Sequence, residues 1–475
     1  MSGPSFVLVA SRQLTHPSQL KLFIPIDLIL LFSAIPAPEA RRPLRMQLRT
    51  VSPEDVRQMH FDPVDPVARN QADAIIQEVR EHGLEGLLAE AVRLGDIPDV
   101  TSKLFYNKED LEHAFQQIDS DTQQVLLRTA SRIKSFADAQ RASISEITVN
   151  IPGGKAGHYI APVSVAGCYA PGGRYPLPSS VLMTAVTARS AGVPKVWVAS
   201  PRPAPATLAA AHVAGADGLL AAGGAQAIGA LAYGIDGHLP SADVIVGPGN
   251  KWVTAAKSLV SGICAIDMLA GPSEVLIIAD ESCDADVVAS DLLAQAEHDT
   301  EARPILVCTS LGVVEKVNTS LNKLLSTLPT APTASKACDK GFACVCPTIE
   351  SAIGVSDMIG PEHLEIHTRN PEDVAAKCSN YGAIFIGSIS AEVLGDYGAG
   401  PNHVLPTCGT SRYTGGLSVF TFLRIRTWMN ITKKEEAQDL IQDCVSLARV
   451  EGLEGHARAA EARLDDSRMI KRAKH

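Results

Sequence analysis

The chain has 475 residues, of which 46% are hydrophobic and 20% are charged, and its formal net charge is -10. One hydrophobic core does not normally serve a chain of this length, so at least two domains are expected. The negative charge, the lack of a long basic run and an aromatic content of only 5% argue against nucleic acid as the main partner.

The first 45 residues differ in character from the rest. Their apolar run, 22–36, is interrupted by Pro25 and Asp27 and is too short for a membrane span. No acidic residue precedes Asp27, which favours an organelle presequence, and Met46 opens ordinary sequence. We therefore treat 1–45 as an extension and possible targeting segment. The expected location is cytoplasmic, or a plastid or mitochondrion if 1–45 act as a presequence, and no membrane partner is expected.

The cysteines indicate a reducing compartment. Ten are present, scattered singly apart from Cys344-Val-Cys346, and no CxxC pair occurs. Neither a zinc ribbon nor a thioredoxin-type site is therefore expected. Scattered thiols in a long chain are typical of buried, reduced residues in an intracellular enzyme.

Helical periodicity dominates residues 54 to 134, clearest over 67–79 and 115–136. From residue 163 short apolar runs alternate with helical segments, and a second such series starts at residue 274. The expected strands are 164–170, 195–199, 218–221, 244–246, 274–279, 304–308, 364–367 and 383–386. The expected intervening helices are 180–191, 205–214, 225–233, 251–258, 285–298 and 313–325. This alternation predicts parallel βαβ units in two α/β layers. The charged segment from 433 onward is expected to be helical, as a solvated pair or an arm packing on another subunit.

Three glycine-containing turns follow strands of the first series: Tyr169-Ala-Pro-Gly-Gly173, Gly223-Gly-Ala-Gln226 and Gly247-Pro-Gly-Asn250. Such turns can bind a nucleotide, because free N–H groups at helix N-termini attract phosphate. Each alone is more simply an ordinary βα turn. Together they favour a cofactor site. No G-x-G-x-x-G or Walker A sequence occurs, so a standard dinucleotide fingerprint and a nucleotide hydrolase are not supported.

Two pairs of residues have metal-ligand chemistry. Gln295 and His298 are three apart near the end of an expected helix and so share a face. Asp396 and His403 lie in a glycine-containing loop that could bring a carboxylate and an imidazole together. Oxygen and imidazole ligands together suit a divalent metal such as zinc. The alternatives are a solvated helix face for the first pair and an ordinary Asx turn for the second.

Two further pairs join a glutamate to a histidine. The adjacent Glu362 and His363 could supply two proton-transfer groups, or could be a loop pair in water. On a regular helix Glu451 and His456 would be about 140° apart, which by itself is typical of surface residues.

These residues fall within a family pattern. From about Met46 to Asp465 the chain resembles histidinol dehydrogenase. The motifs that carry the resemblance are Tyr169-Ala-Pro-Gly-Gly, Gly223-Gly-Ala-Gln-Ala-Ile, Val246-Gly-Pro-Gly-Asn, Ala270-Gly-Pro-Ser-Glu-Val, Ser290-Asp-Leu-Leu-Ala-Gln-Ala-Glu-His, Pro361-Glu-His-Leu and Asn402-His-Val-Leu-Pro-Thr.

The resemblance implies oxidation of L-histidinol to L-histidine through L-histidinal, with two NAD+ reduced. It implies His363 as the general base for the alcohol and Glu362 as the activator of the water that hydrates the aldehyde. The implied zinc ligands, for one Zn2+ per subunit, are Gln295, His298, Asp396 and His456, with His456 donated by the partner subunit of a homodimer. The implied NAD contacts are Tyr169, Gln226 and Asn250. The implied substrate contacts are Ser273, Gln295, His298, His363, Asp396, His403, Glu451 and His456.

The expected architecture is α/β, with two Rossmann-like, incompletely doubly wound parallel-sheet domains, N-terminal helices and a C-terminal helical dimerisation arm. Residues 46–170 and 272–410 are expected to form the domain with the zinc and catalytic residues. Residues 171–271 are expected on the NAD side, and 411–475 in the arm.

Two departures leave a second function open. The run from Cys408 to Gly416 resembles relatives that oxidise other small alcohols, including sulfonated diols, and Gly360 stands where alanine is commoner. The alternative is therefore a paralogous NAD-dependent dehydrogenase for a hydroxysulfonate or polyol. A catalytically silent, zinc-stabilised scaffold is disfavoured, because every expected ligand and acid/base residue is present.

Overall fold

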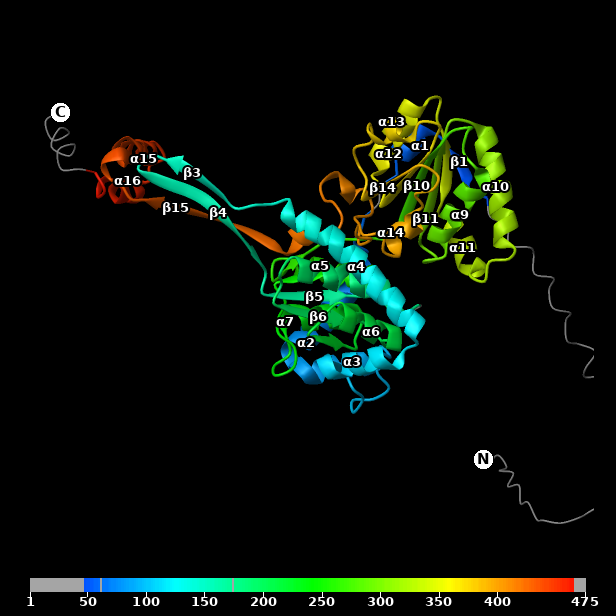
Figure 1. The fold of residues 1–475 in the computed structure, drawn as a ribbon, viewed down its shortest axis with the longest axis horizontal. Coiled ribbons are helices and arrows are strands. Elements are labelled where there is room, and N and C mark those ends of the chain that lie inside the picture. Colours follow the sequence, from blue (N-terminus) through cyan, green and yellow to red (C-terminus); the bar gives the residue numbers. More distant parts are fainter. Residues whose placement is uncertain (1–46, 60–61, 173–174, 465–475) are drawn as a thin grey trace, which may run out of the picture. The chain divides into compact units, whose positions relative to one another are not determined.

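The computed structural model describes residues 47–59, 62–172 and 175–464, so the expected extension 1–45 lies outside the described residues. The strands form two six-stranded sheets and one three-stranded sheet (Figure 1). None of the helices in these ranges is long and apolar enough to cross a bilayer.

Sheet I, the first six-stranded sheet, has an antiparallel strand at one edge and is otherwise parallel. Its order is β2 (Phe105–Asn107), β7 (Gly218–Leu220), β6 (Lys195–Ala199), β5 (Val165–Tyr169), β8 (Val244–Val246) and β9 (Ala265–Ile266). The chain winds outward from β5 in one direction and then returns to β8 on its other side. The strand order therefore reverses between β5 and β8, which is the place where open α/β sheets bind ligands.

Helices cover sheet I in two groups. One group contains α3 (Lys108–Gln117), α4 (Ser120–Ala142), α5 (Pro178–Ser190) and α6 (Pro205–Val213), and the other contains α2 (Pro66–Arg93), α7 (Gly224–Tyr233) and α8 (Lys251–Val260). α2 begins at Pro66 after an Asp65 cap that accepts the Ala68 N–H. Ile76 and Val79 of this helix pack against Gly229 of α7, so a small residue allows close helix contact.

Sheet II is parallel throughout its described pairs. Its order is β1 (Arg49–Val51), β12 (Phe342–Val345), β11 (Arg303–Cys308), β10 (Glu274–Ala279), β13 (His363–His367) and β14 (Ala383–Ile386). All six residues of β10 are buried, as expected for a central parallel strand that is covered on both faces. Here the order reverses between β10 and β13.

Two separate cores flank sheet II. One contains residues of α9 (Ala285–Ala296), α10 (Leu311–Leu325) and α11 (Ala331–Cys338), and the other contains residues of α1 (Pro53–Arg57), α12 (Ile349–Ile359) and α13 (Pro371–Ala375). Alternate residues of β10 divide between them, with Ile277 in the first and Ile278 in the second. Helix α14 (Glu392–Asp396) follows β14. The predicted α/β class with two parallel sheets is confirmed.

Sheet III is antiparallel and was not predicted. Its order is β15 (Leu423–Ile431), β4 (Gly154–Pro162) and β3 (Ile147–Ile151), and helices α15 (Gln438–Val450) and α16 (Glu454–Glu461) follow β15. Short 3-10 helices lie at Thr410–Arg412, Val419–Phe422 and Glu435–Ala437. The arm 411–475 therefore contains a nine-residue strand as well as the predicted helices.

The structure divides the chain differently from the expected domains. Residues 46–170 were expected with sheet II, but α2, α3 and α4 pack on helices of sheet I, and β5 is a central strand of that sheet. The reason is that the apolar stripe of a helix indicates that the helix is buried but does not specify its partner. Only β1 and α1 from this range lie on sheet II.

Candidate active site

The predicted proton-transfer pair lies at the amino end of β13. Helix α12 ends at Gly360, whose φ of 58° is left-handed, and Pro361 then leads into Glu362 and His363. His363 is paired in register with Val275, so the side chain lies beside the start of β10. Both Glu362 and His363 are buried, which contradicts the solvated-loop alternative.

Hydrogen bonds fix the tautomer of His363. Its Nδ1 lies 3.1 Å from the backbone oxygen of Glu274, and because a carbonyl can only accept, Nδ1 carries the proton. In the neutral imidazole Nε2 then has the lone pair, and this atom has no hydrogen-bond partner among the described residues. Asp396 Oδ1 lies 3.4 Å from this atom. His363 is therefore arranged as a proton acceptor at Nε2.

Carboxylates surround this histidine. Burial opposes its charged form, but the nearby charges of Glu362, Glu392 and Asp396 raise the pKa of His363 well above the usual value. Burial raises the pKa of Glu362 to about 8, and its Oε2 accepts the Glu274 N–H at 2.8 Å. Three carboxyl groups thus gather around one imidazole, and a cation bound beside them would favour their ionised forms.

Three of the four expected zinc ligands meet beside this pair. His298 Nε2 lies 3.8 Å from Asp396 Oδ2, close to the roughly 3–3.5 Å that separates neighbouring ligands around zinc. Despite its burial, Asp396 has a pKa lowered to about 2 by His363 and the other histidines. The Gln295 amide can be oriented so that Nε2 donates to Glu392 Oε1 at 2.9 Å while Oε1 lies 2.8 Å from Glu274 N, where it would share this N–H with Glu362. The carboxylate, imidazole and amide fit zinc chemistry, although the amide oxygen needs to turn toward the ion.

The fourth expected zinc ligand, His456, and the expected substrate contact Glu451 are on other elements. His456 is exposed on α16 and Glu451 is exposed at the C-cap of α15. Among the described residues, neither forms a hydrogen bond or ion pair with Gln295, His298 or Asp396. The contacts of the described residues therefore link three of the four expected zinc ligands to the Glu362–His363 pair.

The other substrate positions lie at the same site. His403 Nδ1 donates to the backbone oxygen of Asp396 at 2.8 Å, and Ser180 Oγ is 3.3 Å from its Nε2. Burial lowers the pKa of His403, so this imidazole is held neutral. Ser273 directly precedes β10 and is half-buried, with its backbone oxygen accepting the Arg303 N–H. His403 and Ser273 are therefore placed to contact a ligand near Asp396 and Glu274.

The three expected NAD residues lie at the carboxyl edge of sheet I. Tyr169 ends β5, and its hydroxyl oxygen accepts the Gly224 N–H at 3.2 Å. Gln226 is buried in the first turn of α7. Asn250 caps α8, with Oδ1 accepting from the backbone of Trp252 and Val253, so its Nδ2 remains for a ligand. These positions flank the reversal of strand order in sheet I.

A buried ion pair holds the turn that carries Asn250. Asp267 Oδ2 accepts the Gly247 N–H at 2.7 Å, and Lys257 Nζ donates to the Gly247 oxygen at 2.9 Å and to Asp267. Gly247 has φ 119°, and a Cβ there would lie 2.0 Å from the Tyr169 oxygen. The backbone N–H and the backbone oxygen of Gly247 are therefore both fixed by side chains that the sequence analysis did not single out.

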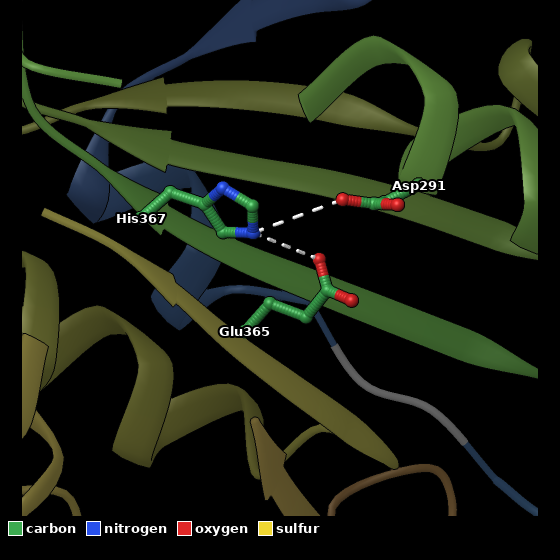
Figure 2. Close-up of side chains that lie close together, drawn as sticks. All are labelled: Asp291, Glu365 and His367. Atoms are coloured by element: carbon green, nitrogen blue, oxygen red, sulfur yellow. Dashed lines mark hydrogen bonds and ion pairs between the residues drawn. The ribbon is translucent and has the colours of Figure 1, made fainter. Parts of the chain in front are cut away.

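A second cluster behind the site was also missed (Figure 2). His367 Nε2 lies 3.2 Å from Glu365 Oε2 and 3.7 Å from Asp291 Oδ2, and all three residues are buried. The i, i+2 spacing of Glu365 and His367 on a strand could have revealed it, because such residues share a face.

The geometry of this cluster favours shared protons over a metal ion. A metal-bound imidazole normally donates its other N–H to an acceptor, but within the described ranges His367 Nδ1 has no partner. Burial, and then the charge of Glu365, raise the pKa of Asp291 to about 7. Glu365 Oε1 also accepts the Glu392 N–H at 2.7 Å, which connects the cluster to the carboxylate beside His363.

Comparison with known proteins shows the family to which the chain is related. A family model described as histidinol dehydrogenase matches residues 63–464. Histidinol dehydrogenase of Nitratidesulfovibrio vulgaris is 43% identical over 412 residues, which cover 85% of this chain and 93% of that protein. That of Thermus thermophilus is 41% identical over 412 residues, covering 86% and 96%. The crystal structure of histidinol dehydrogenase from Elizabethkingia anophelis has a TM-score of 0.81 at 29% identity and covers 88% of this chain and 98% of that one.

Proposed function

Since the chain belongs to the histidinol dehydrogenase family, we propose that it oxidises L-histidinol to L-histidine through L-histidinal, with zinc bound and two NAD+ reduced. The observation that carries this proposal is the buried His363, whose Nε2 lies 3.4 Å from Asp396 Oδ1. It places a proton acceptor next to the expected metal ligands.

His363 is assigned the first proton transfer. Its Nδ1–H is held by the Glu274 carbonyl, so Nε2 can accept the hydroxyl proton of the alcohol. As that proton leaves, the carbinol carbon can release hydride, which NAD+ accepts. Burial of the histidine keeps bulk water from competing for the lone pair.

Glu362 is assigned to the second oxidation. The aldehyde must first gain water, whose oxygen bonds to the carbonyl carbon while one of its protons passes to a base. Ionised Glu362 can take that proton, and its pKa of about 8 suits exchange of the proton near neutrality. After His363 has released its first proton to solvent, the hydrate loses the hydrogen of its carbon as hydride to a second NAD+ and a hydroxyl proton to His363.

Zinc would be held by Gln295, His298 and Asp396, together with His456 of the partner subunit. When bound, it supplies a positive centre that orients the imidazole and amine of the substrate. A cation on Asp396 also weakens the hold of that carboxylate on His363. The pKa of His363 then moves back toward neutrality, where the residue can act as a base.

A homodimer with shared sites completes the proposed ligand set. His456 and Glu451 are exposed on the C-terminal helices, as donors to a neighbouring copy would be. Glu451 of the partner subunit would then contact the substrate beside His403 and Ser273. The proposed partners are thus a small-molecule substrate and a second copy of this chain, with neither nucleic acid nor membrane.

The assay is NADH formation from L-histidinol by purified, zinc-loaded protein. We expect about two NADH per histidinol consumed, since the reaction removes four electrons. Absence of turnover would overturn the proposed substrate. A panel of hydroxysulfonates and polyols tests the second candidate, which the Cys408–Gly416 run favours. There Cys408 adopts φ 55° and its N–H donates to Glu274 Oε2, beside the proposed substrate position.

The proposed cellular location depends on residues 1–45. The enzyme is cytoplasmic, or acts in a plastid or mitochondrion if residues 1–45 serve as a presequence. Mass spectrometry of the mature N-terminus distinguishes these cases, because cleavage near Met46 indicates import.

A further inference from the structure

The turn between β7 and α7 is tied to a carboxylate from outside the sheet. Asp96 lies just beyond α2, and its Oδ2 accepts the Gly223 N–H at 2.8 Å and the Gln226 side-chain Nε2–H at 2.7 Å. Burial raises the pKa of Asp96, while these two donors favour its ionised form. The Gly223 N–H, which would otherwise be available to a ligand, is thus hydrogen-bonded within the protein.

The same contact sets the polarity of the Gln226 amide. A carboxylate can only accept, so Nε2 must face Asp96 and Oε1 must face away from it. Gln226 is 2% exposed, and its Oε1 has no hydrogen-bond partner among the described residues. Oε1 lies beside Gly224, whose N–H donates to the Tyr169 hydroxyl. A buried acceptor without a donor is costly unless a ligand supplies one.

We propose that Asp96 is a positioning residue of the NAD site, and that Gln226 Oε1 accepts a hydrogen bond from a hydroxyl or amino group of the cofactor. The inference rests on the proposed NAD-linked function. It also assigns the turn a role opposite to phosphate binding, because the carboxylate occupies the Gly223 N–H and would repel a phosphate. The cofactor's phosphates then bind elsewhere.

The test measures NADH binding to the zinc-loaded full chain by fluorescence titration, with no alcohol substrate present. Asp96→Asn lets the Gln226 amide turn, and binding should weaken about tenfold or more, the usual effect of losing a charge-assisted hydrogen bond. Asp99→Asn is the matched control, since Asp99 lies in the same segment and, among the described residues, accepts hydrogen bonds from Thr101 and Ser102 of its own turn. That variant should bind NADH like the wild type.

Whether Asp96→Asn weakens or strengthens NADH binding distinguishes a positioning role of Asp96 from phosphate binding by the turn. If the turn bound phosphate, removing the Asp96 charge would strengthen NADH binding, and stronger or unchanged binding overturns the proposal. Failure of the wild type to bind NADH overturns it too. A wild type that binds NADH but does not oxidise histidinol removes the proposed substrate and leaves this inference standing.

A swapped pair distinguishes positioning from simple loss of structure. Gln226→Glu places two carboxylates together and should bind NADH weakly. Adding Asp96→Asn supplies a donor to Glu at 226 and leaves its other oxygen as the acceptor, so binding should recover by about tenfold over the single variant. A double variant no better than Gln226→Glu contradicts the assignment. Equal thermal midpoints of the two variants show that folding does not cause the difference.

Discussion

Substituting Asp291 by asparagine should remove a pH-dependent cost to stability. Asp291 has its pKa raised from 3.8 to about 7, first by burial and then by Glu365. For an acid with a raised native pKa, the native state holds its proton at a pH where the unfolded chain has lost it. The free energy of unfolding therefore falls as pH rises from about 4 to about 7, and stays lower above that.

The magnitude follows from the size of this pKa difference. About three pKa units correspond to about 4 kcal/mol at most, since each unit is about 1.4 kcal/mol. Part of this shift comes from the charge of the neighbouring Glu365, so we expect about 2–3 kcal/mol between about pH 5 and about pH 8. Asparagine is neutral throughout and can donate to Glu365 as the protonated acid does. Relative to the wild type, Asp291→Asn should gain stability over this range as pH rises.

Urea unfolding of chelator-treated protein measures this gain, because bound zinc would add its own pH dependence. Hydrogen exchange of β13 amides gives a local measure of the same effect. The matched control is Asp286→Asn on the same helix, where hydrogen bonds and Lys323 lower the pKa and keep the carboxylate ionised across the range. Its effect should not vary with pH. If the Asp291→Asn effect is equally constant, Asp291 is ionised in the native state and the shared-proton interpretation is wrong.

Three further predictions concern the site and the cofactor turn. His363→Asn should lower kcat for histidinol about 100-fold or more while leaving NADH affinity unchanged, because only proton removal is lost, and an unchanged rate would refute its role as base. Glu362→Gln should slow oxidation of supplied histidinal much more than oxidation of histidinol to the aldehyde in single-turnover assays, and equal losses would contradict its assignment to water. Lys257→Met should destabilise the fold by about 3–5 kcal/mol in urea unfolding, because Asp267 is left buried without its counter-charge. Adding Asp267→Asn should recover part of that loss, and no recovery would mean that the charge is not the cause.

The sequence predicted those parts of the fold that local patterns determine. Apolar runs such as 274–279 and 195–199 became central strands, because continuous burial on both faces leaves a clear signal. Sheet III gave no such signal. β15 is mostly exposed and pairs with β4, more than 250 residues earlier in the chain, so neither apolar content nor local spacing indicated it.

The identity of the site residues could be predicted from the sequence, but their hydrogen bonds and protonation could not. The family resemblance implied Gln295, His298 and Asp396 as ligands, and the structure brings them to the Glu362–His363 pair. The tautomer of His363 could not be predicted, because it depends on a carbonyl of β10 that only folding places beside Nδ1. Asp291 was overlooked for the same reason, since a single acid on an apolar helix acquires its raised pKa from a strand about 75 residues later.

His456 is exposed on α16, and among the described residues it forms no hydrogen bond with the other expected zinc ligands. If a partner subunit uses this residue, as proposed, the placement has a genetic consequence. In the proposed dimer each site draws residues from both chains, so defective alleles need not behave alike. An allele lacking His456 and one lacking His363 would assemble into mixed dimers with one intact site and one that carries both defects. The two alleles would then complement each other in a cell that expresses both, whereas two alleles that both lack His363 would not.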